Sequence, residues 1–325
     1  MMKGMVSRPQ EAATRWSVMI PAYNAERYLR ETLASVLVQA PGPDVMQIEV
    51  VDDASAVDPT PVVREVCGDR VAVFRHEANR GHVATFNTCI ERARGELVHL
   101  LHADDQVRPG FYERLGRALD ERLEAGAAFC RYISMDEDGH WIGIARLEQR
   151  APGLLEGWLE KIAAGQRLQP PCMVVRRAVY AALGGFDARI SSYGEDWEMW
   201  TRIAAAYPVW YEPEPLAVYR VGRASLSGSA LRTGDNVRQL LQVTDMIRAY
   251  LPPERADELT ARARRSAAEA SIRRGVRLAR SGDTRGGLAQ IRWSVRADRS
   301  RTTLTRSLGG LARVVAAAAR RRPVP

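Results

Sequence analysis

The stretch that decides the fold is Glu96–Tyr112, with the sequence ELVHLLHADDQVRPGFY. Its largely apolar run, 97–101, is typical of a buried parallel strand. Two adjacent carboxylates, Asp104 and Asp105, follow that run, and a Pro-Gly pair then precedes a predicted helix. Ligands of open α/β sheets bind beyond the carboxyl ends of strands, and a carboxylate pair there suits Mg2+ or Mn2+ bound to a substrate phosphate. The structural alternative is an Asx turn that caps the helix.

The chain before this stretch alternates apolar runs with amphipathic segments. Strands are predicted at 17–20, 48–51 and 71–74, and helices at 28–37 and 81–94, the first with Asn24 as its N-cap. This alternation predicts a doubly wound, mostly parallel α/β sheet with right-handed crossovers. Because Tyr23, Asp53 and the Asp104–Asp105 pair each follow a predicted strand, we expect them to gather at one edge of the sheet.

The second half of the chain changes character. Strands are predicted at 127–135, 141–145 and 173–175, a short helix at 154–164, a strand ending at Tyr219-Arg220 and a loop at 225–229. Glu195 and Asp196 begin a further predicted helix, where carboxylates are electrostatically favoured whatever their function. Like charge and the indole of Trp197 would raise the pKa of Asp196 whereas the helix N-terminus would lower it, and the sequence does not decide the sign.

Helical patterns alone follow from Asp235, at 235–251, 254–280, 284–298 and 301–322. We therefore expect a lead-in at 1–15, a catalytic domain at 16–230 and a helical C-terminal region at 235–325. The catalytic domain would divide into a nucleotide-binding half, 16–108, and an acceptor half, 109–230.

Composition is that of a water-soluble protein. The 325 residues are 46% hydrophobic and 26% charged, with no apolar stretch long enough for a membrane span and no apolar core of a secretory signal near the N-terminus. Its four cysteines form no CxxC pair, which favours reduced thiols and a cytoplasmic location over a disulfide framework or a zinc site.

The net charge of +8 is concentrated at the C-terminus, where residues 281–325 hold ten arginines and two aspartates. The last predicted helix also has an apolar stripe, which comprises Leu308, Leu311, Ala312, Val315, Ala316 and Ala319. Arginines occur in the same helix at Arg306, Arg313 and Arg320–Arg322. This pattern fits packing on the preceding helices or peripheral contact with an anionic membrane at its inner face. Nucleic-acid binding is disfavoured because Trp293 is the lone interleaved aromatic.

An ordered set of motifs carries a family resemblance. These are SVMIPAYNAERYL at 17–29, EVVDDAS at 49–55, ERARGELVHLLHADD at 91–105, GGFD at 184–187 and GEDWEMW at 194–200. Together they resemble the family-2 glycosyltransferases of the GT-A fold. The resemblance implies transfer of a sugar from a nucleotide diphosphate donor to an acceptor hydroxyl, such as that of a glycan or lipid-linked glycan, with inversion at the anomeric carbon.

The resemblance also implies roles in donor binding. Pro21, Ala22 and Tyr23 would hold the nucleobase, with the Tyr23 ring against it. Asp53 would accept a hydrogen bond from the imide N–H of uracil or thymine, which favours a UDP sugar and allows a TDP sugar.

The remaining roles concern the reaction itself. Asp104 would contact the ribose or a metal-bound water, and Asp105 would bind Mg2+ or Mn2+. Asp196 would be the catalytic base with Glu195 beside it, because an acceptor hydroxyl is a poor nucleophile until a carboxylate takes its proton. Arg220 could add positive charge near the leaving diphosphate, whose charge the divalent ion would stabilise.

Two positions depart from the family pattern. His102 stands where many members have the first Asp of Asp-x-Asp-Asp, and it could bind the metal or form a hydrogen-bonded wall of the site. Val221-Gly222-Arg223 replaces the histidine that often follows the Tyr-Arg strand, with Arg223 supplying charge in its place.

Other functions fit the sequence less well. No GxGxxG follows the first strand, which excludes the usual dehydrogenase fingerprint, and the basic Gly-rich loop of nucleotidyltransferases is absent too. The remaining alternative is a catalytically silent nucleotide-sugar-binding or scaffold protein that docks through its basic helical tail.

Overall fold

The computed structural model describes residues 14–222 and 226–319. Packing divides them into two compact units. The first unit comprises the chain up to Trp158 together with Leu168–Ala188 and Ala206–Val221. The second comprises Leu159–Arg167, Arg189–Ala205 and the residues from Gly222 onward.

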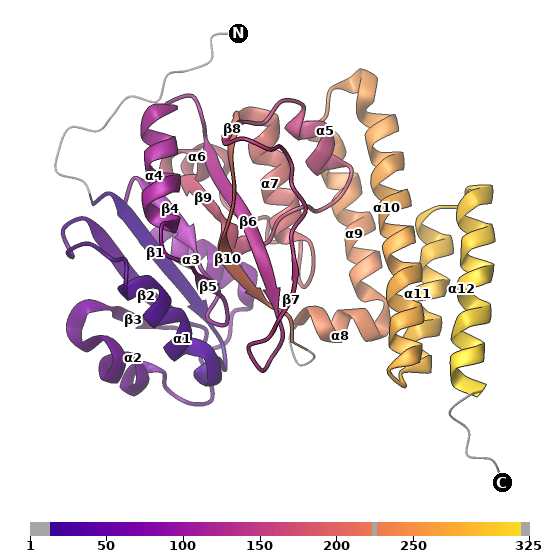
Figure 1. The fold of residues 1–325 in the computed structure, drawn as a ribbon, viewed down its shortest axis with the longest axis horizontal. Helices are drawn as coiled ribbons and strands as arrows, with labels where there is room; N and C mark the ends of the chain where they lie inside the picture. Colours follow the sequence, from indigo (N-terminus) through magenta and orange to yellow (C-terminus); the bar gives the residue numbers. More distant parts are fainter. Residues whose placement is uncertain (1–13, 223–225, 320–325) are drawn as a thin grey trace. The chain divides into compact units, whose positions relative to one another are not determined.

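The first unit is built on one sheet, to which ten strands belong among the described residues (Figure 1). They are β1 (Trp16–Ala22), β2 (Met46–Asp52), β3 (Ala72–Arg75), β4 (Leu97–Leu100), β5 (Gln106–Val107), β6 (Ala127–Met135), β7 (Trp141–Ile144), β8 (Gly153–Leu154), β9 (Met173–Arg176) and β10 (Val209–Arg220). The sheet order is β3-β2-β1-β4-β9-β6-β10-β5, with β7 on β6 and β8 on β10.

The sheet contains the expected parallel core. β1 runs parallel to β2 and β4, β2 to β3, and β6 to β10, whereas β9 is antiparallel to both β4 and β6. The chain first builds β2 and β3 on one side of β1 and then places β4 on its other side. The β1–β4 pair is therefore a topological switch point, where open α/β sheets bind ligands beyond their strand ends.

Helices connect the strands of the first unit. They are α1 (Glu26–Leu37), α2 (Thr60–Cys67), α3 (His82–Arg92), α4 (Phe111–Glu121) and α6 (Arg177–Leu183), with 3-10 turns η1 (Gly68–Arg70) and η2 (Pro170–Cys172). Gly95, between α3 and β4, approaches β1 so closely that a Cβ there would lie 2.4 Å from the carbonyl carbon of Trp16. Only glycine fits this position, because any side chain would drive β4 away from β1.

The second unit is helical. It holds all but the first residue of α5 (Trp158–Ala163) and all but the last of α7 (Glu195–Ala206). The other helices are α8 (Leu226–Thr233), α9 (Asp235–Ile247), η3 (Arg248–Tyr250), α10 (Pro253–Arg280), α11 (Thr284–Ala297) and α12 (Arg301–Ala319). None of the helices among the described residues is long and apolar enough to cross a membrane.

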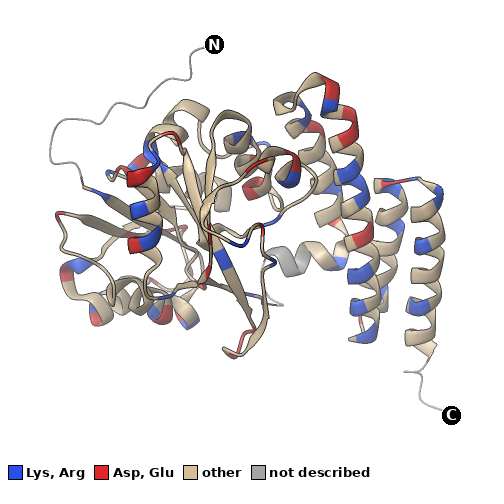
Figure 2. Ribbon diagram, turned by 45° about the horizontal axis from the view of Figure 1, so that its top comes forward, with Lys and Arg blue, Asp and Glu red and all other residues tan. Residues whose placement is uncertain are grey.

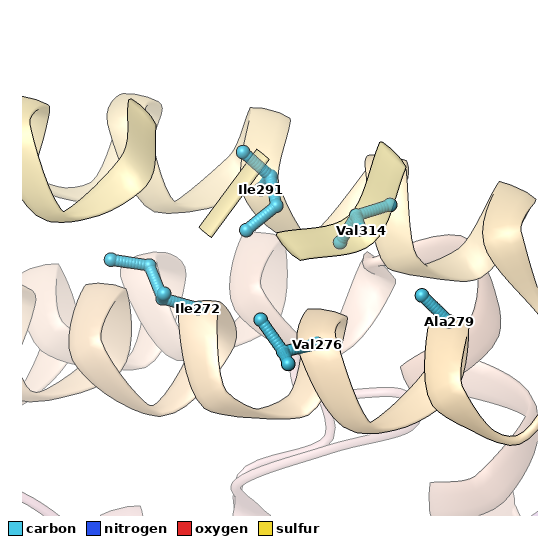
Figure 3. Packing of buried hydrophobic residues seen from close by; sticks show 5 residues of the cluster. All are labelled: Ile272, Val276, Ala279, Ile291 and Val314. Atoms are coloured by element: carbon cyan, nitrogen blue, oxygen red, sulfur yellow. The ribbon is translucent and has the colours of Figure 1, made fainter. Parts of the chain in front are cut away.

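The last three helices pack through one apolar cluster, which comprises Ile272, Val276, Ala279, Ile291 and Val314 (Figure 3). Glycines bring the helices close, since a Cβ on Gly275 would lie 2.8 Å from the carbonyl oxygen of Gly287. The Asp283 carboxylate caps α11 by accepting the Gly286 N–H at 2.8 Å.

Two local expectations were wrong. Asn24 does not cap α1, whose N-cap is Ala25; Asn24 has a φ of 50° and accepts the Ala56 N–H at 2.9 Å. Its side chain is thus used to join the ends of β1 and β2. The loop predicted at 225–229 is helical from Leu226, as the start of α8. Residues 1–13, Arg223 and Arg320–Arg322 lie outside the described residues.

Candidate functional site

The predicted nucleobase residues lie where β1 and β2 end. Pro21 and Ala22 are the last residues of β1, and Tyr23 follows with 54% of its surface exposed. The N–H of Asp53 donates to the carbonyl of Ala22 at 2.9 Å, which locks the two strand ends together. Nucleobase binding by these residues stays a prediction.

The buried Asp53 carboxylate is held by backbone amides just before α3. Its Oδ1 accepts the Arg80 N–H at 2.8 Å, and its Oδ2 accepts the Gly81 N–H at 2.9 Å. An ionised carboxylate has about four acceptor positions, so this group retains capacity for a further donor. The neighbouring Asp52 differs, because the Ser55 hydroxyl and N–H both donate to it within the turn.

The second acidic pair lies beyond β4. The Asp105 N–H donates to the His102 carbonyl at 3.0 Å and closes a tight turn after the strand. His102, Asp104 and Asp105 each offer a ligand atom, and these atoms lie within 4.8 Å of one another. This is a backbone turn and not the Asx turn of the structural alternative, since α4 begins after Gly110 with no side-chain cap. It gathers three groups of the types that bind divalent cations.

Asp105 is buried in an electrostatically unfavourable position. Its Oδ1 accepts the Arg220 N–H at 2.8 Å, whereas its Oδ2 is buried and has no hydrogen-bond donor among the described residues. Burial and the neighbouring Asp104 raise the pKa of Asp105 well above its ordinary value. An unsatisfied buried carboxylate oxygen fits a cation ligand, and an oxygen-rich donor set fits Mg2+ or Mn2+.

Arg220 ties this acidic turn to the elements around it. Its Nε donates to the Asp104 carbonyl at 2.9 Å, and its Nη2 to the Glu31 carboxylate at 2.6 Å. The guanidinium also donates to the Asp136 carbonyl at 3.3 Å and lies 4.1 Å from the centre of the Tyr28 ring. These contacts make Arg220 a support for the turn, and contact with a diphosphate stays a prediction.

Sequence reasoning missed the supporting residues on α1. The Thr32 hydroxyl donates to the carbonyls of Ala103 and Asp105 at 2.9 and 2.8 Å, and Glu31 pairs with Arg220 as described. A contact between a helical residue and a loop about seventy positions later does not affect the pattern of residue types near either position in the sequence. No signal in a single sequence could have identified these contacts.

His102 has two neighbours of different kinds. Its ring stacks on Phe86, with ring centres 5.1 Å apart and planes 23° apart. Its Nδ1 lies 3.9 Å from Asp105 Oδ2. The geometry thus accommodates both predicted roles, as a wall residue and as a metal ligand.

The candidate base lies in the second unit. Asp196 is the second residue of α7 and is almost fully buried. Its Oδ2 accepts a hydrogen bond from the Gln166 side chain, and its Oδ1 accepts the Trp197 N–H at 2.7 Å. The Trp197 indole is itself anchored by donating to the Ile162 carbonyl at 2.7 Å. The carboxyl is therefore held in one orientation.

The structure decides the sign of the Asp196 pKa shift, which the sequence left open. Burial and then the charge of Glu195 raise the pKa of Asp196 from 3.8 to about 8, against the opposing hydrogen bonds from Trp197 and Gln166. A carboxyl that titrates near neutral pH is suited to accept a proton from a hydroxyl. The contribution of Gln166 had no signal in the sequence.

The predicted site residues fall into separate groups. In the first unit, the structure brings Asp104, Asp105 and Arg220 together at one turn, and it joins Ala22 to Asp53 at the adjacent strand ends. In the second unit it places Glu195 and Asp196 side by side on α7.

Known proteins resemble this chain in sequence and in structure. Residues 17–184 match the family described as glycosyl transferase family 2. An uncharacterized protein of Mycobacterium tuberculosis, MT1568, is 27% identical over 68% of this chain and 72% of its own length. TuaG of Bacillus subtilis, assigned provisionally to teichuronic acid biosynthesis as a glycosyltransferase, is 31% identical over 39% of this chain and 51% of its own length.

Among solved structures, residues 1–349 of TarS from S. aureus in complex with UDP-GlcNAc superpose with a TM-score of 0.65. The superposition covers 94% of this chain and 92% of that one, at 16% sequence identity. Identity this low shows a shared fold, and the shared fold confirms the GT-A architecture with a helical C-terminal region.

Proposed function

Because this chain belongs to glycosyl transferase family 2, we propose that it transfers a sugar from a nucleotide diphosphate donor to an acceptor hydroxyl, with inversion at the anomeric carbon. A UDP sugar is the favoured donor and a TDP sugar the alternative. The fixed Asp53 carboxylate supports this choice, because it accepts hydrogen bonds and both bases present an imide N–H. The complex of TarS with UDP-GlcNAc adds support by analogy.

The observation that carries the proposal is the buried Asp105 oxygen that lacks a donor at the switch point of the sheet. Asp105 and Asp104 would hold Mg2+ or Mn2+ there. When bound, the ion would supply positive charge that stabilises the departing diphosphate. Arg220 and Glu31 would keep the turn in place as that charge develops.

A residue of the second unit would accept the proton of the acceptor hydroxyl. The ionised Asp196 carboxylate would accept the proton of the acceptor hydroxyl as its oxygen bonds to the anomeric carbon and the bond from that carbon to the diphosphate breaks. Gln166 and Trp197 would hold the carboxylate, and Glu195 would keep its pKa high. One base is sufficient, since the nucleotide diphosphate leaves as an anion without a protein acid.

We further propose the division of labour expected from the sequence, with catalysis in residues 16–230 and a helical region at 235–325. The reaction would belong to bacterial polysaccharide or glycoconjugate synthesis in the cytoplasm, peripherally at the inner face of the membrane. The resemblance to TuaG supports this pathway class.

A thermal-shift panel tests the donor and the metal together. Full-length protein is heated with UDP, TDP and GDP sugars, each with Mn2+, with Mg2+ or with a chelator, because a ligand that binds the folded state raises its melting temperature. We expect the largest rise with a UDP sugar and a divalent ion. A GDP sugar that stabilises equally, or no effect of metal, would contradict the assignment.

Turnover must then be measured with the stabilising donor, as hydrolysis or as transfer to small acceptors. Binding with neither reaction, in the presence of metal and across several acceptor classes, would favour the silent nucleotide-sugar-binding protein instead.

A further inference from the structure

Helix α12 has one packed face and one open face. The packed face consists of Thr303, Ser307, Gly310 and Val314, all buried. Ser307 shares a hydrogen bond of 2.9 Å with Ser294 of α11, and a Cβ on Gly310 would lie 2.8 Å from the Ile291 side chain. Figure 3 shows Val314 among the apolar side chains of α10 and α11. The rotation of α12 about its axis is therefore fixed by close packing.

The neighbouring face, about 100° around the helix axis, is apolar and exposed. We call it the outer stripe, and it consists of Leu304, Leu308, Leu311 and Val315. These residues are spaced at i, i+4, i+7 and i+11, and they are 38%, 68%, 37% and 56% exposed. Every residue of the apolar stripe expected from the sequence is exposed, so α12 packs through other side chains.

Positive charge lies on one side of the outer stripe. Arg301 flanks the stripe on α12, whereas Arg313 projects from the other side of that helix, and α11 exposes Arg285, Arg292 and Arg296 along with Leu288. Residues 299–319 contain no acidic residue, and α12 carries basic but no acidic bands in Figure 2. Arg306 pairs with Glu269 of α10, whereas Arg292 and Arg301 have no ion-pair partner among the described residues.

We propose that the outer stripe, Arg301 and the arginines of α11 form a docking surface for an anionic lipid bilayer. Aliphatic side chains enter the boundary between headgroups and acyl chains, while the arginines meet the negative surface potential of the leaflet. A second copy of this face would bring like charges together, and nucleic acid offers no partner for four exposed aliphatic side chains. This surface belongs to the second unit alone, and the inference does not depend on the donor or on the chemistry.

Vesicle flotation of the full-length protein tests the proposal. We expect flotation with vesicles of phosphatidylglycerol and phosphatidylcholine, loss of flotation with phosphatidylcholine alone, and weaker binding as salt rises. Leu308→Gln with Val315→Gln should reduce the partition coefficient about tenfold or more, since two aliphatic side chains no longer leave water. The matched control, Val38→Gln with Leu123→Gln, removes two exposed aliphatic residues of the first unit and should not change it.

A variant that removes positive charge provides a second, independent test of membrane docking. Arg292→Gln with Arg301→Gln should reduce binding to anionic vesicles about tenfold and flatten its salt dependence. Circular dichroism and donor-dependent thermal shifts should stay as in the wild type for every variant, which separates failure of docking from failure of the proposed function.

Three results would overturn the proposal. The first is no flotation of the wild type, or an equal loss in the control pair. The second is a dimer by light scattering that Leu308→Gln with Val315→Gln dissociates, which would assign the surface to a second copy. The third is binding of a labelled oligonucleotide that the arginine variant abolishes while vesicles are ignored.

Discussion

Asp105 in the first unit and Asp196 in the second are both buried carboxyl groups whose pKa is raised by burial and by an adjacent acid. Their surroundings differ in one respect. Both oxygens of Asp196 accept hydrogen bonds, whereas Asp105 Oδ2 accepts none from the described residues. A buried carboxylate can be stabilised by a proton or by a cation. This difference supports the roles that we propose for the two groups, proton exchange for Asp196 and metal binding for Asp105.

The largest effect is expected from Asp105→Asn. It should abolish transfer and the Mn2+-dependent part of nucleotide binding, measured by calorimetry, because an amide no longer offers an anionic ligand. Without metal, the variant should melt at or above the wild-type temperature, since an unpaired buried carboxyl has been replaced by a neutral group. Asp120→Asn, on an exposed face of α4, is the matched control. Unchanged Mn2+-dependent affinity would remove Asp105 from the metal site.

Asp196→Asn should act on the chemical step alone. We expect kcat to fall by roughly 10² to 10⁴ with donor affinity nearly unchanged, since a base contributes in the transition state. Glu195→Gln should cost less, because in this scheme Glu195 only raises the pKa of its neighbour. An inactive Glu195→Gln beside an active Asp196→Asn would exchange the two roles, and two active variants would place the base elsewhere.

The pH dependence sharpens the assignment of Asp196. The base must be ionised, so kcat should rise with pH up to an apparent pKa of about 8. Because the Gln166 hydrogen bond lowers that pKa, Gln166→Ala should move the rising limb to higher pH while leaving the plateau similar. A limb that stays in place in Gln166→Ala would show that another group controls the profile.

The raised pKa of Asp196 also affects the stability of the folded protein. Between pH 3.8 and about 8 the folded carboxyl holds a proton that the unfolded chain has released, so the contribution of Asp196 to stability falls as pH rises. Asp196→Asn should therefore weaken the pH dependence of the melting temperature across this window. An unchanged dependence would indicate that the carboxyl is ionised in the folded protein.

His102→Asp should have the smallest effect. If His102 is a ligand, a carboxylate in its place should change Mn2+-dependent nucleotide affinity several-fold and favour Mg2+ relative to Mn2+, because imidazole suits transition metals better than Mg2+. If it is a wall residue that stacks on Phe86, the melting temperature should fall and the metal preference should stay. His102→Asn, which keeps the site neutral, is the control for charge.

Local pattern predicted most of the fold. The limits of β6 agree with the expected 127–135, and Asp53 follows β2 and the Asp104–Asp105 pair follows β4 as expected. The pattern could not reveal that β9 inserts antiparallel between β4 and β6, because the direction of a strand depends on partners distant in sequence. The pattern also missed α2 and α6. These helices have eight and seven residues, too few to show a recognisable helical periodicity of apolar residues.

The candidate site, like the fold, has features that the sequence predicted and features that it could not predict. Acidic residues at strand ends and at a helix start were visible, since their type and position recur. The contacts that tune them were not: Gln166 reaches Asp196 across thirty residues, and Arg220 reaches Glu31 across 189. Such pairs exist only once the chain is folded, so local spacing contains no trace of them.

The hydrogen bond from the Arg220 backbone N–H to Asp105 offers a reporter for the proposed metal site. The N–H donates to Oδ1, the oxygen of Asp105 that has a protein partner among the described residues, with 2.8 Å between nitrogen and oxygen. A cation that binds the other oxygen would replace a proton there or add positive charge, and either change alters the electron density on the oxygen that accepts this bond. The amide resonance of Arg220 should then shift as Mg2+ is titrated in. Occupancy of the site could thus be followed in solution by NMR, with no sugar donor and no turnover.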